Sequence, residues 1–186
     1  MRVIAGKARR LLLKTLEGTD TRPTTDRIKE TLFNILQSDL YGCSFLDLFA
    51  GSGGIGIEAL SRGALEAVFV DSNPKAASII RENLQRTRLE EQARVVLADA
   101  AAALPRLENH GRFDIIFMDP PYRKGLENAA LAYLAGSSLA DEETLVIIEA
   151  DIDTDFSWTS ECGFEVIREK KYKTNKHMFL KRKQEN

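Results

Sequence analysis

Three glycines and an aspartate have a spacing that suits a small-molecule site. Gly51, Gly53 and Gly56 spell G-x-G-x-x-G between an apolar run and a helical pattern, and Asp71 ends the next apolar run. Glycines allow a tight turn there, and they let backbone N–H groups approach a ligand closely. A carboxylate at the position of Asp71 can accept both hydrogen bonds of a ribose diol. The spacing therefore predicts a nucleoside-binding loop.

The acidic residues around this loop favour one kind of nucleoside cofactor over another. The pyrophosphate of a nicotinamide dinucleotide would bind at the helix N-terminus, where Asp47 and Glu58 would repel it. S-adenosylmethionine carries an ammonium group, a sulfonium and a ribose diol but no phosphate, so we expect it as the cofactor. Asp99, at the end of the third predicted strand, can bind the adenine amino group, cap the following helix, or do both.

The residues Asp119-Pro120-Pro121-Tyr122 directly follow a fourth apolar run. Prolines fix φ and lack N–H donors, so this loop should be rigid and its carbonyl groups free to accept. An exocyclic amine on a base is a poor nucleophile because its lone pair is delocalised into the ring. Asp119 and the Pro120 carbonyl can accept both amine hydrogens and aim the lone pair at a methyl sulfonium, while Tyr122 stacks on the base. The alternative is a plain rigid turn with Tyr122 packed on the core.

Short apolar runs alternate with helical patterns from residue 44 onward, and these elements must position the two loops. The alternation predicts a mostly parallel sheet covered on both faces, with a C-terminal hairpin whose last strand is antiparallel. The expected strands are 44–49, 67–70, 94–98, 113–118, 144–149, 164–171 and 177–183, and the expected helices are 54–61, 74–85, 100–107 and 127–134.

The residues before 44 follow a different pattern. Residues 2–5 and 10–13 predict a short strand pair around Gly6, and residues 25–36 predict an amphipathic helix. The chain has 186 residues and shows no linker or repeat, so we expect a single domain over 1–186. Within it, residues 1–40 would form a substrate-binding hairpin and helix, and residues 44–186 the cofactor-binding and catalytic core.

The net charge of −2 conceals a strong asymmetry along the chain. Residues 1–14 carry +5, residues 168–186 carry +6, and the segment between them carries −13. Basic ends around an acidic body favour an anionic partner, although two solvated basic segments would leave the same pattern.

Composition excludes several other classes. No apolar run approaches the ~20 residues of a membrane span. The first residues carry positive charge without an apolar stretch, so we do not expect them to act as a secretory signal. Cys43 and Cys162 form no CxxC pair, so we expect a reducing cytoplasm and no disulfide framework. His110 and His177 have no second ligand at metal spacing, so we expect both at the surface and no metal site.

The chain resembles the RsmD family of class I S-adenosylmethionine-dependent methyltransferases, bacterial enzymes that methylate guanine N2 in small-subunit (16S) ribosomal RNA. The resemblance rests on four segments: residues 6–10, RPTTDRIKETLFNIL at 22–36, DLFAGSGGIGIEALSRGA at 47–64, and DPPYRKG at 119–125. It implies a Rossmann-like fold with a seven-stranded sheet. It also implies action on 16S ribosomal RNA. Because a compact chain has little surface for reading a long sequence, we expect the target within the small subunit or an assembly intermediate. Nothing in the sequence demands more than a monomer, so we expect a monomer.

The resemblance also implies roles for the matching residues. Asp119, Pro120, Pro121 and Tyr122 would hold the guanine. Cofactor contacts would come from Asp47, Gly51, Gly53, Asp71, Asp99 and Thr24, and RNA contacts from Lys7, Arg9, Arg10, Arg22 and Arg27. The basic terminal hairpin is a further candidate for phosphate contacts.

Three other functions remain open. The same Asp-Pro-Pro-Tyr motif occurs in DNA and protein amino-methyltransferases, although 186 residues leave little room for a DNA-recognition domain. A ribosome-assembly protein that binds without catalysis could keep the same fold. A dehydrogenase could keep the same glycine loop.

Overall fold

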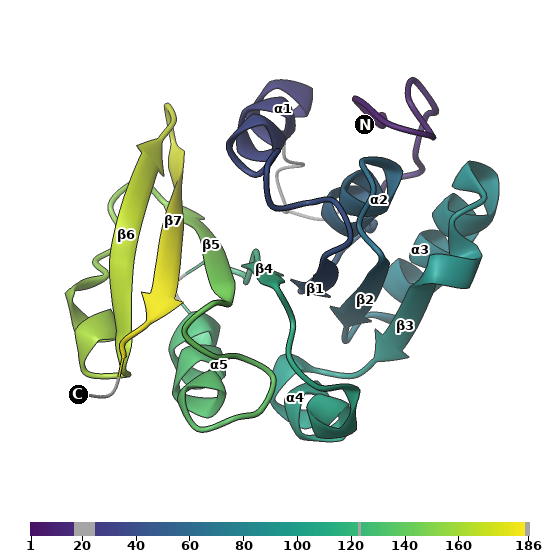
Figure 1. The fold of residues 1–186 in the computed structure, drawn as a ribbon. Coiled ribbons are helices and arrows are strands. Elements are labelled where there is room, and N and C mark those ends of the chain that lie inside the picture. The colour runs from purple at the N-terminus through teal and green to yellow at the C-terminus, as the bar shows by residue number, and fades with distance from the viewer. Residues whose placement is uncertain (17–24, 123, 185–186) are drawn as a thin grey trace.

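The computed structural model describes residues 1–16, 25–122 and 124–184, which build on a seven-stranded sheet. The strands lie in the order β3-β2-β1-β4-β5-β7-β6 (Figure 1). Strands β1 to β5 run parallel, whereas β7 is antiparallel to both β5 and β6. The bounds are β1 Ser44–Leu48, β2 Glu66–Asp71, β3 Ala93–Leu97, β4 Ile115–Met118, β5 Leu145–Asp151, β6 Phe164–Lys171 and β7 Asn175–Arg182. The expected α/β fold with an antiparallel last strand is confirmed.

Helices cover both faces of this sheet (Figure 1). Leu32, Ile57 and Ile80 bring α1, α2 and α3 into one buried cluster, and Leu104 and Leu131 bring α4 and α5 into a second cluster on the other face. The helices are α1 Asp26–Ile35, α2 Gly54–Ser61, α3 Pro74–Thr87, α4 Ala100–Leu107 and α5 Leu126–Ala135, with 3-10 turns at Glu90–Gln92, Glu108–His110 and Ser157–Ser160. All five expected helices are therefore present.

Alternation along each strand decides which cluster a side chain joins. In β1, Phe45 lies in the first cluster and Leu46 in the second, because successive side chains point to opposite faces. Phe117, Ile147 and Phe179 lie in the first cluster with Phe45. Because side chains alternate between faces, a residue two positions further along the same strand faces the same side as its cluster member. This is the side covered by α1, α2 and α3.

Polar residues define where three helices begin. The Thr25 hydroxyl accepts from the N–H of Ile28 at the start of α1. Asn73 caps α3, in which Pro74 supplies a preset φ and no superfluous donor. Asp99 caps α4 by accepting from the N–H of Ala102 at 2.8 Å. The capping role predicted for Asp99 is confirmed.

The expected strand pair at the N-terminus is shortened to a single antiparallel bridge, between Arg2 and Leu12. The N–H of Val3 donates to the Leu11 carbonyl and that of Leu13 to the Met1 carbonyl, both at 3.0 Å, on either side of the bridge. The rest of the segment forms no ladder. The cause is its attachment to α2: a Cβ on Gly6 would lie 1.8 Å from the carbonyl oxygen of Ser61, and the Lys7 N–H donates to that same oxygen at 2.8 Å. The chain bends at Gly6 to meet the helix end, so a regular ladder does not continue.

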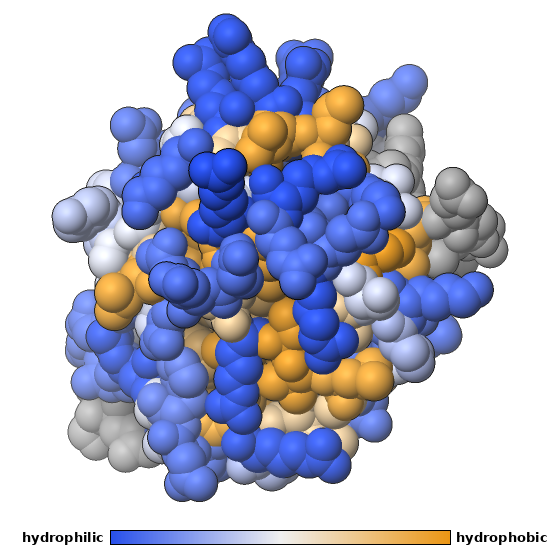
Figure 2. Space-filling model, turned by 90° about the vertical axis from the view of Figure 1, so that its right-hand side faces the viewer, coloured by the Kyte–Doolittle hydropathy of each residue, from blue (hydrophilic) through white to orange (hydrophobic). Residues whose placement is uncertain are grey.

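The outer surface is mainly hydrophilic on the side where α3 and β3 lie, with separate hydrophobic areas (Figure 2). Strand β3 forms the edge of the sheet there, and its Leu97 is half-exposed. No helix in the described parts of the chain has the length and apolar character to cross a bilayer.

Candidate active site

Four carboxylates lie near the carboxyl ends of four parallel strands and point to one face of the sheet. Each follows, by two positions, a hydrophobic residue of the first cluster, so all four face the side covered by α1, α2 and α3. In strand order they are Asp71 on β2, Asp47 on β1, Asp119 after β4 and Glu149 on β5. Since parallel strands end at a common edge, the expected ligand edge is acidic.

The glycine loop between β1 and α2 is held by two of these carboxylates. The N–H of Gly51, which has a φ of 56°, donates to Asp71 Oδ2 at 2.8 Å. The N–H of Gly56 donates to Asp47 Oδ2 at 2.9 Å. A Cβ on Gly56 would lie 2.3 Å from the Phe69 ring, so this glycine lets α2 pack closely on β2.

Gly53 lies at the N-terminus of α2 and has a left-handed φ of 80°. This conformation favours glycine, because a Cβ would crowd the backbone. The loop thus turns sharply from the strand into the helix beside Asp47 and Asp71, as the glycine spacing predicts.

Burial raises the proton affinity of the two central carboxylates. Asp47 is 2% exposed, and burial raises its pKa to about 7, against a smaller lowering effect of the Gly56 N–H. Burial also raises the pKa of Asp119, and the negative charges of Glu149 and Asp47 raise it further. Asp119 is therefore a carboxylate that accepts a proton readily.

The Asp-Pro-Pro-Tyr loop begins where β4 ends. Asp119 is half-buried and Pro120 is buried, while Pro121 and Tyr122 are exposed. Tyr122 is 44% exposed, so the alternative in which its ring packs into the core is wrong. The loop presents a carboxylate at the base of the site and an aromatic ring at its surface.

The site residues fit S-adenosylmethionine. Asp47 Oδ2 accepts from the Gly56 N–H, and this buried carboxylate has further acceptor capacity for an ammonium group. Asp71, 20 residues after Gly51, lies where a ribose diol would be bound and already orders the loop. These residues would hold the cofactor, which supplies an electrophilic methyl group when bound.

The predicted RNA-binding residues lie apart from the carboxylates. Arg9, Arg10 and Arg27 line a surface hollow of about 300 Å³, together with Arg2. Lys7 is exposed on the same N-terminal segment. Arg22 and Thr24, by contrast, lie outside the described residues.

Glu58 does not shape the cofactor site, and the expectation that it would repel a ligand phosphate is wrong. It is fully buried in α2, where it accepts from the backbone N–H groups of Ile4 at 2.8 Å and Ala5 at 3.0 Å. Lys29 Nζ lies 3.3 Å from Glu58 Oε2, and Arg62 Nε donates to Oε1 at 2.8 Å. The carboxylate fixes the N-terminal segment to α1 and α2.

The expected surface position of the two histidines is also wrong. His177 is fully buried on β7, where Nε2 lies 3.1 Å from Glu149 Oε2. His110 is half-buried and stacks on Phe113 at 4.3 Å between ring centroids. Neither belongs to a cluster suited to a metal in the described residues.

Sequence reasoning missed Glu149 as a residue of the site. It lies at the end of the predicted strand 144–149, as Asp47, Asp71 and Asp119 lie at the ends of theirs. That shared position was the available signal.

The strand order, the glycine loop and the acidic carboxyl edge together define a Rossmann-like class I methyltransferase fold. A family model described as "Conserved hypothetical protein 95" matches residues 1–181. The chain belongs to this family.

Several relatives of the chain carry more specific names. It is 40% identical over 160 residues to the putative rRNA methyltransferase YlbH of Bacillus subtilis (strain 168), covering 86% of this chain and 87% of that protein. It is 36% identical over 164 residues to the ribosomal RNA small subunit methyltransferase D of Haemophilus influenzae, covering 86% and 85%. A solved structure described as a putative methyltransferase, yhhF from Escherichia coli, has a TM-score of 0.83 at 32% identity and covers 100% of this chain and 99% of its own.

Family membership confirms three expectations: the RsmD-like resemblance, the class of methyltransferase, and S-adenosylmethionine as its cofactor. The roles of individual site residues stay predictions, although the structure brings Asp47, Asp71 and Asp119 to one edge.

Proposed function

We propose that the chain transfers a methyl group from S-adenosylmethionine to the exocyclic N2 of a guanine in small-subunit ribosomal RNA. The observation that carries the proposal is the end of β4. There Asp119, with a raised pKa, and the rigid Pro120 carbonyl lie at an acidic edge, and an exposed Tyr122 follows. Two acceptors beside an aromatic ring match an amine on a flat base.

The chemistry asked of these residues is positioning and proton acceptance. Asp119 and the Pro120 carbonyl accept the two N2 hydrogens, which turns the nitrogen lone pair toward the methyl carbon. The bound cofactor would supply the methyl carbon and keep the S–C electron pair on sulfur, so positive charge would move to the nitrogen. Asp119 stabilises that charge and takes the excess proton. Tyr122 stacks on the base after it leaves its own stack.

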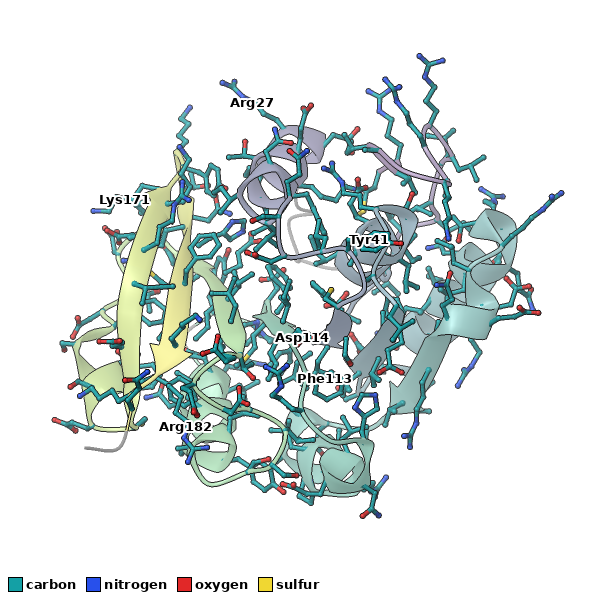
Figure 3. The ribbon with its side chains drawn as sticks, in the orientation of Figure 1. Arg27, Tyr41, Phe113, Asp114, Lys171 and Arg182 are labelled. Carbon is teal, nitrogen blue, oxygen red and sulfur yellow. The ribbon has the colours of Figure 1, made fainter. Side chains whose placement is uncertain are left out.

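Two basic regions support an RNA substrate. Arg27 and Lys171 point outward at one end of the molecule, while Arg182 lies at the opposite end (Figure 3). Lys171 pairs in register with Lys176, which in turn pairs with Ala150, so the hairpin reaches the sheet edge next to Glu149. Phosphates held by the N-terminal arginines and the hairpin lysines would lie on either side of the site.

The size of the chain also favours one setting for the reaction. A compact chain of 186 residues, with no second recognition module in its described part, has little surface for reading a long RNA sequence. A folded RNA surface within the small subunit or its assembly intermediate is therefore the expected substrate, met by a monomer in the cytoplasm. Residues 1–40 would act as the RNA-binding part of a single methyltransferase domain.

The test is methyl transfer from labelled S-adenosylmethionine to unmodified small subunits, to naked small-subunit RNA and to duplex DNA, followed by nucleoside analysis. We expect N2-methylguanosine from subunits or their RNA, and the ratio of the two will show whether bound proteins are needed. Label in DNA alone, or in a ribosomal protein, would replace the RNA proposal with one of the other amino-methyltransferase functions. Binding to subunits without any label would favour an assembly protein.

A further inference from the structure

Glu149 lies beside Asp119 through the pairing of β4 with β5. Met118 pairs with Ile148, so Asp119 and Glu149 are the next positions on two strands that lie ~4.8 Å apart. Both residues come two positions after members of the first cluster, Phe117 and Ile147, and therefore face the same side. The electrostatic effect of Glu149 on Asp119 agrees with this closeness.

The C-terminal hairpin holds Glu149 in place. Asn175 Nδ2 donates to Glu149 Oε1 at 2.7 Å, and His177 Nε2 lies 3.1 Å from Oε2. Glu149 and His177 are a register pair of β5 and β7, and Asn175 and Glu149 are both nearly inaccessible to solvent. A glutamate side chain has several rotamers, and two donors on a rigid strand select one of them.

His177 is in turn oriented by Tyr172, which precedes β7. The Tyr172 hydroxyl lies 3.1 Å from His177 Nδ1, and burial raises the pKa of Tyr172 to about 12, so the hydroxyl keeps its proton and donates. The Glu149 carboxylate can only accept, so Nε2 is assigned as the nitrogen that carries the hydrogen, and in the neutral ring Nδ1 is the acceptor for the Tyr172 hydroxyl. The rings of Phe117 and Phe179 meet His177 edge to face, at 6.0 Å and 6.5 Å between centroids.

We propose that Glu149 is a positioning residue for Asp119, and that the hairpin holds its carboxylate as a second negative charge beside the proton acceptor of the reaction. The inference rests on the proposed function for the identity of the amine. During transfer, positive charge leaves the sulfur and appears on the nitrogen, so a fixed carboxylate on the nitrogen side stabilises the transition state more than the ground state. Glu149 accomplishes this without touching the substrate.

The groups that face Asp119 come from several elements. Asp47 on β1 and Glu149 on β5 raise its pKa by their charge. Behind Glu149 lie His177 on β7 and Tyr172, and Arg168 on β6 lies over the Phe179 ring at 5.8 Å. Lys29 of α1 is engaged by Glu58 and by the carbonyl of Arg2. Of these two charges, Glu149 raises the pKa of Asp119 more than Asp47 does.

The experiment is a carboxyl ¹³C NMR titration of aspartate-labelled protein, in which the Asp119 signal is assigned by its loss in Asp119→Ala. In Glu149→Gln we expect the titration of Asp119 to move about one pH unit or more to lower pH, because a neighbouring negative charge is gone. The acid limb of the methyl-transfer rate should move with it, and the maximal rate should fall roughly 10-fold or more. An Asp119 titration that stays in place in folded Glu149→Gln would overturn the inference.

Three further variants separate positioning from general loss of structure. His177→Gln keeps a donor for Glu149, so the Asp119 titration should match the wild type, whereas His177→Leu should shift it in the direction of Glu149→Gln. Glu143→Gln, at the exposed pair with Lys181, is the matched control and should change nothing. Because the titration needs no RNA, it tests Glu149 even if the labelling experiment finds an acceptor other than guanine.

Discussion

Glu58 and Asp119 show two environments in which this fold holds a carboxylate. Glu58 is surrounded by donors: two backbone N–H groups, Lys29 and Arg62. Asp119 has carboxylates for neighbours instead, Glu149 and Asp47. The first environment stabilises a charge and the structure around it, and the second makes a charge costly until a cation or a proton arrives. The difference separates a structural site from a reactive one within one sheet face.

The largest expected effect of a substitution is on catalysis at Asp119. Asp119→Ala should reduce methyl transfer by about 10²–10⁴-fold, because the proton acceptor is lost. Cofactor binding, measured by calorimetry, should survive, and the free energy of unfolding should not fall by more than about 1 kcal/mol, since a buried like-charge contact disappears with the side chain. A variant that turns over at nearly the normal rate would contradict the mechanism.

Glu58→Ala should show the converse result. It leaves Lys29, which is fully buried, without its partner and removes the acceptor of two backbone N–H groups. We expect the free energy of unfolding in urea to fall by about 3–5 kcal/mol. Activity per folded molecule should stay close to normal if the N-terminal segment still docks.

The exposed ion pair of Lys14 with Glu82 offers the control for that measurement. Glu82→Ala should change the free energy of unfolding by less than about 1 kcal/mol. If Glu58→Ala and Glu82→Ala lower the free energy of unfolding equally, the buried contacts of Glu58 do not stabilise the fold more than an exposed ion pair. The contrast between Glu58 and Asp119 would then not hold.

An effect below that of Glu58→Ala is the pH dependence contributed by Asp47, whose pKa is about 7 in the fold against 3.8 for the free side chain. Between these values the folded chain binds more protons than the unfolded chain, so this group lowers stability as pH rises from about 4 to about 7. Asp47→Asn removes the contribution. The variant should therefore gain stability relative to the wild type as pH increases, by up to about 1.4 kcal/mol for each pH unit within that interval.

Urea unfolding of both proteins at pH 5 and pH 8 measures that difference, because titrations elsewhere cancel. Asp153→Asn, at an exposed position, is the control and should show a constant difference. If Asp47→Asn also shows a difference in stability that does not change with pH, then burial does not raise the pKa of Asp47 to about 7.

Much of the fold and the motif part of the site could be predicted from the sequence alone. The strands and helices follow from alternation and from helical spacing, and α2 and α4 have the expected bounds. The glycine loop and Asp119–Tyr122 each lie within a few consecutive residues, so their geometry depends on local backbone conformation. Asp71 was predictable because parallel strands end at one edge.

Only the tertiary structure decided the roles of Glu149, His177 and Glu58. Glu149 meets His177 across 28 positions of sequence, and Glu58 meets Ile4 across 54. The first pair depends on the register of β5 and β7, where a shift of one residue would turn a side chain to the other face. The second depends on how the N-terminal segment packs against α2. Local pattern determined which residues could do chemistry, and the packing of distant segments determined which carboxylate is held by donors and which is left to react.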